Sequence, residues 1–226
     1  MSVEVKKATD IKGLKNTVLV YAKPGGGKTT SLGMLPGKTL VLDVDRTTGV
    51  LKGNKNIDII EVDNLQPLES MSEIITEFKK GLINQYDNIA LDNLSELERC
   101  MLAEYGANGR NDGVPAIGDY QKYQFKVANL IRVLKGFNKN LILTAWEILE
   151  PVTSPTGEQY TRFIPKLQSK IVDNICGLCD VVAHLEIDAE GNRGFRLDGT
   201  KNVYAKNQRD DRKSCRVNEL ILGGNK

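Results

Sequence analysis

The segment Thr17-Val-Leu-Val-Tyr-Ala-Lys-Pro-Gly-Gly-Gly-Lys-Thr29 carries the strongest structural signal in this chain of 226 residues. Its first six residues form a nearly continuous apolar run, which is typical of a strand buried on both faces. Three glycines follow, and a helix is predicted from Lys28 to about Leu35, where Pro36-Gly37 stops it. The segment therefore predicts a buried strand, a glycine turn and a helix in direct succession.

The residues from Ala22 to Thr29 match the phosphate-binding Walker A pattern, with alanine at its opening position. Glycines allow backbone torsions that turn successive N–H groups towards an anion. Lys28 supplies a point charge for β- and γ-phosphates, and the Thr29 hydroxyl is a ligand for Mg²⁺. We therefore expect ATP and Mg²⁺ as ligands. The predicted nucleotide-binding residues are Pro24, Gly25, Gly26, Gly27, Lys28, Thr29 and Thr30.

The rest of the chain alternates short apolar runs with helical stretches. Strands are expected at residues 39–43, 57–62, 88–92, 140–145 and 181–187, with helices at 28–35, 68–83, 94–105, 119–137 and 166–178 and short strands at 194–197 and 202–205. Buried strands separated by helices indicate an α/β fold: a mainly parallel central sheet flanked by helices, with a small β extension near the C-terminus. We expect one domain over residues 1–226, with its core at about 15–212.

Carboxylates at strand ends complete the predicted site. Ile89-Ala-Leu-Asp92 has the Walker B form, so Asp92 is expected to hold Mg²⁺ through a water molecule; the alternative is a helix cap. Asn93 stands where many ATPases have a glutamate. Asp45 is therefore the candidate that orients the attacking water, against a plain surface turn. Thr144, at the end of a later strand, is our first choice for sensing the γ-phosphate.

Composition limits the other possibilities. The chain is 40% hydrophobic and 27% charged, with a net charge of +2, as in an ordinary globular protein. It has no apolar run long enough to span a bilayer and no signal peptide, which predicts a cytoplasmic protein without a membrane partner. Cys176 and Cys179 have the spacing of a zinc half-site or redox motif. No second pair accompanies them, and the single histidine, His184, lies in an apolar run, so we expect buried thiols.

The order of these parts resembles the core of RecA-type recombinases, from about residue 15 to residue 212. Asp45 falls where that family places its catalytic carboxylate, although the family has glutamate there. The resemblance implies that the segments 106–118 and 147–164 contact DNA. The compact length is similar to the core-only phage proteins of the Sak single-strand-annealing type, which implies the cytoplasm of a bacterial host. The segment through which recombinases polymerise is not visible in the sequence.

The resemblance also implies roles for basic residues. Tyr160 and Phe163 interleave with cations in the second segment, a pattern that suits single-stranded nucleic acid; the alternative is a hairpin packed on the sheet. The candidate nucleic-acid contacts are Arg110, Arg162, Lys166 and Lys170. Lys206 and Arg209 resemble a basic strand that reaches the nucleotide of a neighbouring subunit, and the alternative is a solvated tail.

Three functions follow as hypotheses. The first is a DNA-stimulated ATPase that acts on single-stranded DNA in recombination or annealing. It would self-associate with nucleotide at the subunit interface, and a phage single-strand-binding protein or a helicase is a further expected partner. The second is an AAA-type helicase loader or assembly factor, which the strands after residue 145 disfavour. The third is a P-loop small-molecule kinase, disfavoured because segment 147–164 holds a single arginine.

Overall fold

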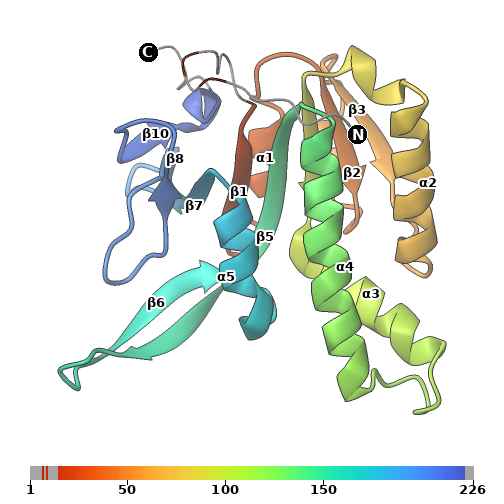
Figure 1. Cartoon of the computed structure of the whole chain (residues 1–226). Helices are drawn as coiled ribbons and strands as arrows, with labels where there is room; N and C mark the ends of the chain where they lie inside the picture. Colours follow the sequence, from red (N-terminus) through yellow and green to blue (C-terminus); the bar gives the residue numbers. More distant parts are fainter. Residues whose placement is uncertain (1–6, 8, 10–14, 222–226) are drawn as a thin grey trace.

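The computed structural model describes residues 7, 9 and 15–221 (Figure 1). The strands are β1 (Thr17–Ala22), β2 (Thr39–Asp43), β3 (Ile57–Glu61), β4 (Asn88–Asp92), β5 (Asn140–Thr153), β6 (Gln159–Pro165), β7 (Val181–Ile187), β8 (Arg193–Arg196), β9 (Lys206–Asn207) and β10 (Ser214–Arg216). The helices are α1 (Lys28–Leu32), α2 (Pro67–Lys79), α3 (Leu94–Ala107), α4 (Ile117–Gly136) and α5 (Ser169–Leu178), with 3₁₀ turns η2 (Thr48–Leu51), η3 (Leu82–Gln85) and η4 (Val217–Glu219).

The strands form one sheet in the order β10-β8-β7-β1-β5-β4-β2-β3. The six strands from β7 to β3 are parallel, whereas β8, β9, β10 and the hairpin strand β6 pair antiparallel. This confirms the predicted fold class, including the β extension near the C-terminus. The P-loop strand β1 lies between β5 and β7, and β5 separates it from β4, the strand that ends in Asp92.

Apolar side chains cover both faces of the sheet, because successive residues of a strand point to opposite sides. Leu19 and Tyr21 of β1 face the larger core, which α2, α3, α4 and α5 complete. Val18 and Val20 face a smaller core with Leu32 of α1. The P-loop helix α1 therefore packs on the face of the sheet that has the smaller core, beside the C-terminal strands (Figure 1).

The register of the parallel strands aligns their polar ends. Asp43 of β2 lies opposite Asp92 of β4, and Val20 of β1 lies opposite Thr144 of β5. Since β4 and β5 pair Leu91 with Leu143, Asp92 and Thr144 are level with each other at the carboxyl edge. This edge is where ligands bind in open α/β sheets.

Several predicted boundaries were wrong. The α1 helix ends at Leu32 instead of Leu35, because Gly33, Met34 and Leu35 each donate to the carbonyl three residues earlier and close tighter turns. The α5 helix begins at Ser169 instead of residue 166, because the Lys166 amide extends the sheet by donating to the Trp146 carbonyl at 2.8 Å.

The C-terminal extension was predicted in kind but not in position. Residues 202–205 form no ladder. Val203 makes only an isolated bridge to Phe163, and the strand that pairs with β7 is β9, at residues 206–207. The strand β10 was not predicted, since its three residues gain regular structure only by pairing with β8.

The sequence predicts either a loop or a hairpin for residues 147–164 and a long helix over residues 119–137. The segment 147–164 is a long β-hairpin of β5 and β6 that projects from the sheet (Figure 1). Helix α4 begins at Ile117, two residues before the predicted start, and the Asp119 carboxylate accepts the Ala116 amide at 2.9 Å from inside the first turn. Within the described residues, no helix is both long and apolar enough to cross a membrane.

Candidate functional site

The P-loop is shaped by its glycines. Gly25 has φ 75° and Gly27 has φ 102°, in the left-handed region that residues with a Cβ avoid. The Gly26 amide closes a turn onto the Lys23 carbonyl at 3.1 Å. Within the part of the chain that the structure describes, the amides of Gly25 and Gly27 have no hydrogen-bond acceptor, so they are free to meet an anion.

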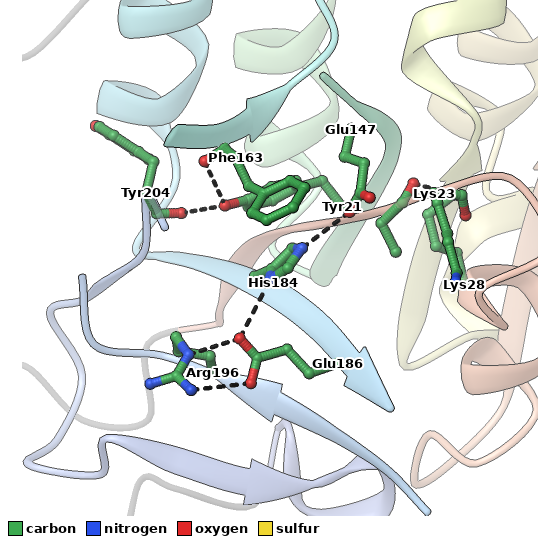
Figure 2. A network of polar contacts seen from close by, with 10 residues as sticks. Tyr21, Lys23, Lys28, Glu147, Phe163, His184, Glu186, Arg196 and Tyr204 are labelled. Carbon is green, nitrogen blue, oxygen red and sulfur yellow. Dashed lines mark hydrogen bonds and ion pairs between the residues drawn. The ribbon is translucent and has the colours of Figure 1, made fainter. Parts of the chain in front are cut away.

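The Lys28 ammonium folds back onto the start of the loop. Its Nζ donates to the carbonyls of Ala22 at 3.0 Å and Lys23 at 3.1 Å (Figure 2). Burial lowers the pKa of Lys28, and the nearby carboxylates of Asp92 and Asp45 offset part of that effect. A buried cation that is held by two neutral carbonyls is a site where an anion would be a stronger partner.

Asp92 is buried beside two hydroxyl groups. Thr29 Oγ1 donates to Asp92 Oδ2 at 2.6 Å, and Thr144 Oγ1 donates to Oδ1. Burial raises the pKa of Asp92, and the two hydroxyl hydrogen bonds counter that rise only in part. The cap of α3 is Asn93, whose Oδ1 accepts the Glu96 amide at 2.8 Å. Asp92 therefore faces the P-loop, and it is Asn93 that caps the free amide at the start of α3.

The Thr29 hydroxyl and the Asp92 carboxylate suit Mg²⁺. Both are oxygen donors, and Mg²⁺ is usually held by one or two protein oxygens together with water and substrate phosphates. Within residues 15–221, no group of three or more His, Cys, Asp and Glu side chains is arranged to hold a metal without such help. The residues present therefore fit a magnesium ion that arrives with a nucleotide.

The two aspartates that follow β2 have different surroundings. Asp43 is buried and closes the turn, because its carboxylate accepts the Arg46 amide at 2.8 Å and the Thr48 hydroxyl at 2.6 Å. Asp45 is half-buried and faces the P-loop. Its two oxygens accept from Thr47 Oγ1 and from Asn93 Nδ2, each at 2.6 Å.

A pocket of about 520 Å³ opens at this edge of the sheet. It is lined by Pro24, Gly25, Gly27, Lys28, Thr29, Thr30, Asp45, Thr47, Val50, Glu96 and Trp146. Sequence reasoning missed Glu96 as a site residue. It lies one helical turn after Asp92, a spacing that returns a side chain to the same side of a helix start.

A second polar cluster lies next to the P-loop strand (Figure 2). His184 Nε2 is 2.9 Å from Glu147 Oε2, and its Nδ1 is 3.3 Å from Glu186 Oε1. Arg196 binds both oxygens of Glu186, at 2.6 and 3.0 Å. Burial favours a higher pKa for Glu186, but the hydrogen bonds from Arg196 and His184 outweigh it, and the pKa is lowered.

The cysteine pair lies in the larger core. Burial raises the pKa of Cys176 to about 12 and that of Cys179 further. Neither thiol is therefore in the thiolate form that metal binding and redox exchange need. The pair fits the expectation of buried small residues.

The predicted nucleic-acid residues are scattered. Arg110 is exposed between α3 and α4, and Lys170 is exposed on α5. Lys166 is exposed, with its Nζ 5.4 Å from the centroid of the Trp146 ring. Arg162 is already paired, since its Nη2 lies 2.8 Å from Glu150 Oε2 and its guanidinium lies over the Tyr204 ring.

Lys206 and Arg209 lie away from this pocket. Strand β9 pairs with Val181 and Val182, at the start of β7, whereas the P-loop follows the carboxyl end of β1. Lys206 Nζ donates to the Cys176 carbonyl at 2.9 Å, and Arg209 Nε donates to Asn16 Oδ1. Neither side chain lines the P-loop pocket of its own chain.

Comparison of the sequence with known protein families finds a match. Residues 14–209 match the family described as AAA domain. This range includes the P-loop, the β5–β6 hairpin and the four strands that carry the site residues, which are β1, β2, β4 and β5. No curated protein matches the chain.

Proposed function

Because this chain belongs to the AAA domain family of P-loop ATPases, we propose that it hydrolyses ATP at the P-loop pocket and couples hydrolysis to single-stranded DNA in recombination or strand annealing. The observation that carries the proposal is the cluster of Thr29, Asp92 and Thr144 beside the buried Lys28. Buried charged groups with shifted pKa values are concentrated at functional sites, and here they lie directly at the P-loop.

Each residue of the cluster has a separate task. Lys28 exchanges the carbonyls of Ala22 and Lys23 for β- and γ-phosphate oxygens. Thr29 and Asp92 hold Mg²⁺, which neutralises phosphate charge when bound. Thr144 orients the Asp92 carboxylate, because its hydroxyl is already committed to that group. Thr144 would sense the γ-phosphate indirectly: a γ-phosphate that takes over the Thr144 hydroxyl changes the hydrogen bonding of Asp92.

Asp45 is the proposed general base. It lines the pocket, and Asn93 and Thr47 hold its carboxylate by one hydrogen bond to each oxygen, which fixes its orientation towards a water. Asn93 joins the two ends of the site, since the same side chain caps α3 and binds Asp45. Glu96 is the other carboxylate in the pocket and the rival for this role.

The proposed link to DNA is the strand β5. It runs without interruption from Thr144, at Asp92, through Trp146, in the pocket wall, into the β5–β6 hairpin. Lys166 follows the hairpin and has its ammonium over the Trp146 ring. A strand that touches Asp92 at one end and carries the hairpin at the other couples the two regions mechanically. Lys166, Lys170 and Arg110 are the exposed cations for phosphate contacts.

The test is the ATPase rate with and without single-stranded DNA at low salt. We expect DNA to raise turnover in the wild type. Lys166→Glu with Lys170→Glu should remove the stimulation and leave the basal rate. Lys55→Glu, an exposed lysine before β3, is the matched control and should keep the stimulation. Equal turnover with and without DNA, together with no DNA binding, would contradict the DNA part of the proposal.

Self-association is part of the proposal, with the nucleotide between subunits. Lys206 and Arg209 lie at the opposite edge of the sheet from their own P-loop, so they meet a triphosphate only from a neighbouring copy. Mixing Lys28→Ala chains with Arg209→Ala chains tests this arrangement. Activity recovered in the mixture supports a shared site, and its absence in a mixture that still assembles contradicts it.

A second candidate function is an assembly factor that acts on a protein partner. The observation in its favour is the exposure of two large apolar side chains in the first half of α4, where Ile117 is 88% and Phe125 is 78% exposed. Large exposed apolar side chains that gather on one segment mark protein interfaces. Capture of a replicative helicase that is lost in the variant Ile117→Ser with Phe125→Ser would favour this function over DNA coupling.

A further inference from the structure

A second hollow of about 1210 Å³ adjoins the P-loop pocket. It lies on the α1 side of the sheet, between the end of α1 and the strands β8 and β10, and Gly27 and Thr30 line both hollows. Asp45 and Lys28 line only the first hollow. The two spaces therefore meet at the P-loop, with the proposed hydrolytic groups on one side only.

We propose that this second hollow binds the nucleoside, the ribose and base, of the triphosphate. The inference rests on the proposed function. If the γ-phosphate lies beside Asp92 and Asp45, a triphosphate that follows the loop leaves it at Thr30 and enters the second hollow. The volume exceeds that of common ligand pockets of about 300–1,000 Å³, so a nucleoside fits with room to spare.

The walls of the hollow are suited to a flat, partly apolar ligand. Met34 and Ile187 are 51% and 43% exposed, although both are apolar, and both line this hollow. Phe195 lines it from the core. Ile187 is on the same face of β7 as Leu185, which packs in the core beside α1. Apolar side chains from the turn after α1 and from β7 thus border one space, as in pockets that enclose a base.

Arg193 stands where the two hollows meet. It lies opposite Ile187 across the β7–β8 pair, and its Nε donates to the Gly26 carbonyl at 3.1 Å. A Cβ at Gly27 would come within 2.7 Å of that Nε, so glycine at this position lets the arginine lie over the P-loop. Among the described residues, no acceptor binds its Nη groups, which leaves them for the α-phosphate or ribose oxygens.

The wall that carries Ile187 is held in place before any ligand arrives. Arg196 and His184 fix Glu186, the residue before it (Figure 2). Asp188 accepts the Asn192 amide at 2.7 Å and its Nδ2 at 3.0 Å, which closes the turn after Ile187. A wall that is already ordered loses little conformational entropy on binding.

Photolabelling with 8-azido-ATP and Mg²⁺ locates the base directly, because the azide is on the base and trypsin places Ile187, Val50 and Trp146 on different peptides. Label on residues 171–193, which carry Ile187, or on Met34 as located by sequencing within residues 29–38, is the expected result. Label on residues 47–52 or 140–162, which carry Val50 and Trp146, would place the base in the first pocket and overturn the inference. Excess ATP should prevent the specific label.

Binding of two ligands separates the nucleoside from its phosphates. Met34→Ser with Ile187→Ser should weaken ATP binding about tenfold through lost apolar contact and leave inorganic tripolyphosphate unchanged. Ile59→Ser is the matched control, because Ile59 on β3 is 42% exposed and lies outside both hollows. ATP affinity unchanged in the double variant overturns the inference.

The same titrations distinguish the two levels of the proposal. Lys28→Ala should weaken the binding of both ATP and tripolyphosphate about 1,000-fold. If the wild type binds neither ligand, the P-loop function itself fails. If it binds both equally tightly, the phosphate site stands and the nucleoside site is wrong.

Discussion

Two polar clusters lie side by side at the carboxyl edge of the sheet, and their charges are treated in opposite ways. Around Asp92, burial raises the pKa of the carboxyl and lowers that of Lys28, so both charged forms are disfavoured. Around Glu186, Arg196 and His184 lower the pKa of the carboxyl, so its charge is favoured. In the first cluster Lys28 and Asp92 have only neutral hydrogen-bond partners, whereas in the second the Glu186 carboxylate is paired with the charged Arg196.

The largest effect should come from removing the cation of the first cluster. Lys28→Ala takes away the charge that meets the β- and γ-phosphates, and we expect nucleotide affinity to fall about 1,000-fold. Isothermal titration with ATP and Mg²⁺ measures the change. Glu147→Gln, in the second cluster, is the control and should bind ATP within a few-fold of wild type. Equal losses in both variants would remove the contrast between the clusters.

The next effect separates the two carboxylates of the pocket. Asp45→Asn keeps the size of the side chain but cannot accept a proton, so we expect kcat to fall about 100- to 1,000-fold with ATP binding retained. Glu96→Gln should change kcat by less than about fivefold. Steady-state ATPase rates with a parallel binding measurement decide between them. The reverse pattern would assign the base to Glu96.

The substitution Asp92→Asn should stabilise the folded protein and at the same time remove its ATPase activity. Its raised pKa means that the folded state favours the protonated acid, so its contribution to stability is present at low pH and is lost as pH rises through the folded pKa. At neutral pH without nucleotide, Asp92→Asn should raise the free energy of unfolding by about 1 kcal/mol, or ~3 °C in Tm. Thermal melts measure this gain, and ATPase assays should show lost Mg²⁺-dependent turnover. A lower Tm in the nucleotide-free variant would contradict the prediction.

The smallest effect belongs to the second cluster. The lowered pKa of Glu186 gives stability that is present above its ordinary value of 4.5 and is lost as pH falls through the lower folded value. Because Glu186 is about one-third exposed, solvent screening limits the contribution to below about 1 kcal/mol. Glu186→Gln should lose that amount at pH 7 and show a flatter decline in stability below pH 4.5, measured by denaturant unfolding. A gain in stability in Glu186→Gln would mean that the charged carboxylate is disfavoured in this cluster as well, and the contrast with Asp92 would be lost.

The parallel strands were predicted from the sequence because their signal is local. A strand such as Thr17–Ala22 is buried on both faces, so every residue in it is apolar or small. The strand β10 and the place of β9 were missed because short antiparallel strands depend on the partner they meet. Ser214–Arg216 has no apolar run and is a strand only through its pairing with β8.

The residues of the site also fall into two groups, those that a local sequence motif predicts and those that only the fold brings together. The P-loop and Asp92 follow from motifs in which spacing along the chain sets position in space. The contact of Thr144 with Asp92 follows from the register between β4 and β5, which no local pattern states. The different tasks of Asp43 and Asp45 depend on Arg46 and Thr48, which close the turn onto Asp43. Arg193 comes from the β7–β8 hairpin, more than 160 residues after the P-loop, so only the fold reveals its contact with Gly26.

The position of β1 also governs how the chain can be assembled during synthesis. This strand is synthesised before both its neighbours, β5 and β7, which begin more than 120 residues later. The amide of Thr17 bonds Asp180, and the hydroxyl of Tyr21 bonds the Tyr204 carbonyl. The apolar run that precedes the P-loop is therefore translated before either of the strands that flank it. A nascent chain that ends before β7 leaves this apolar strand without one of its partners, and unpaired apolar strands are prone to aggregate.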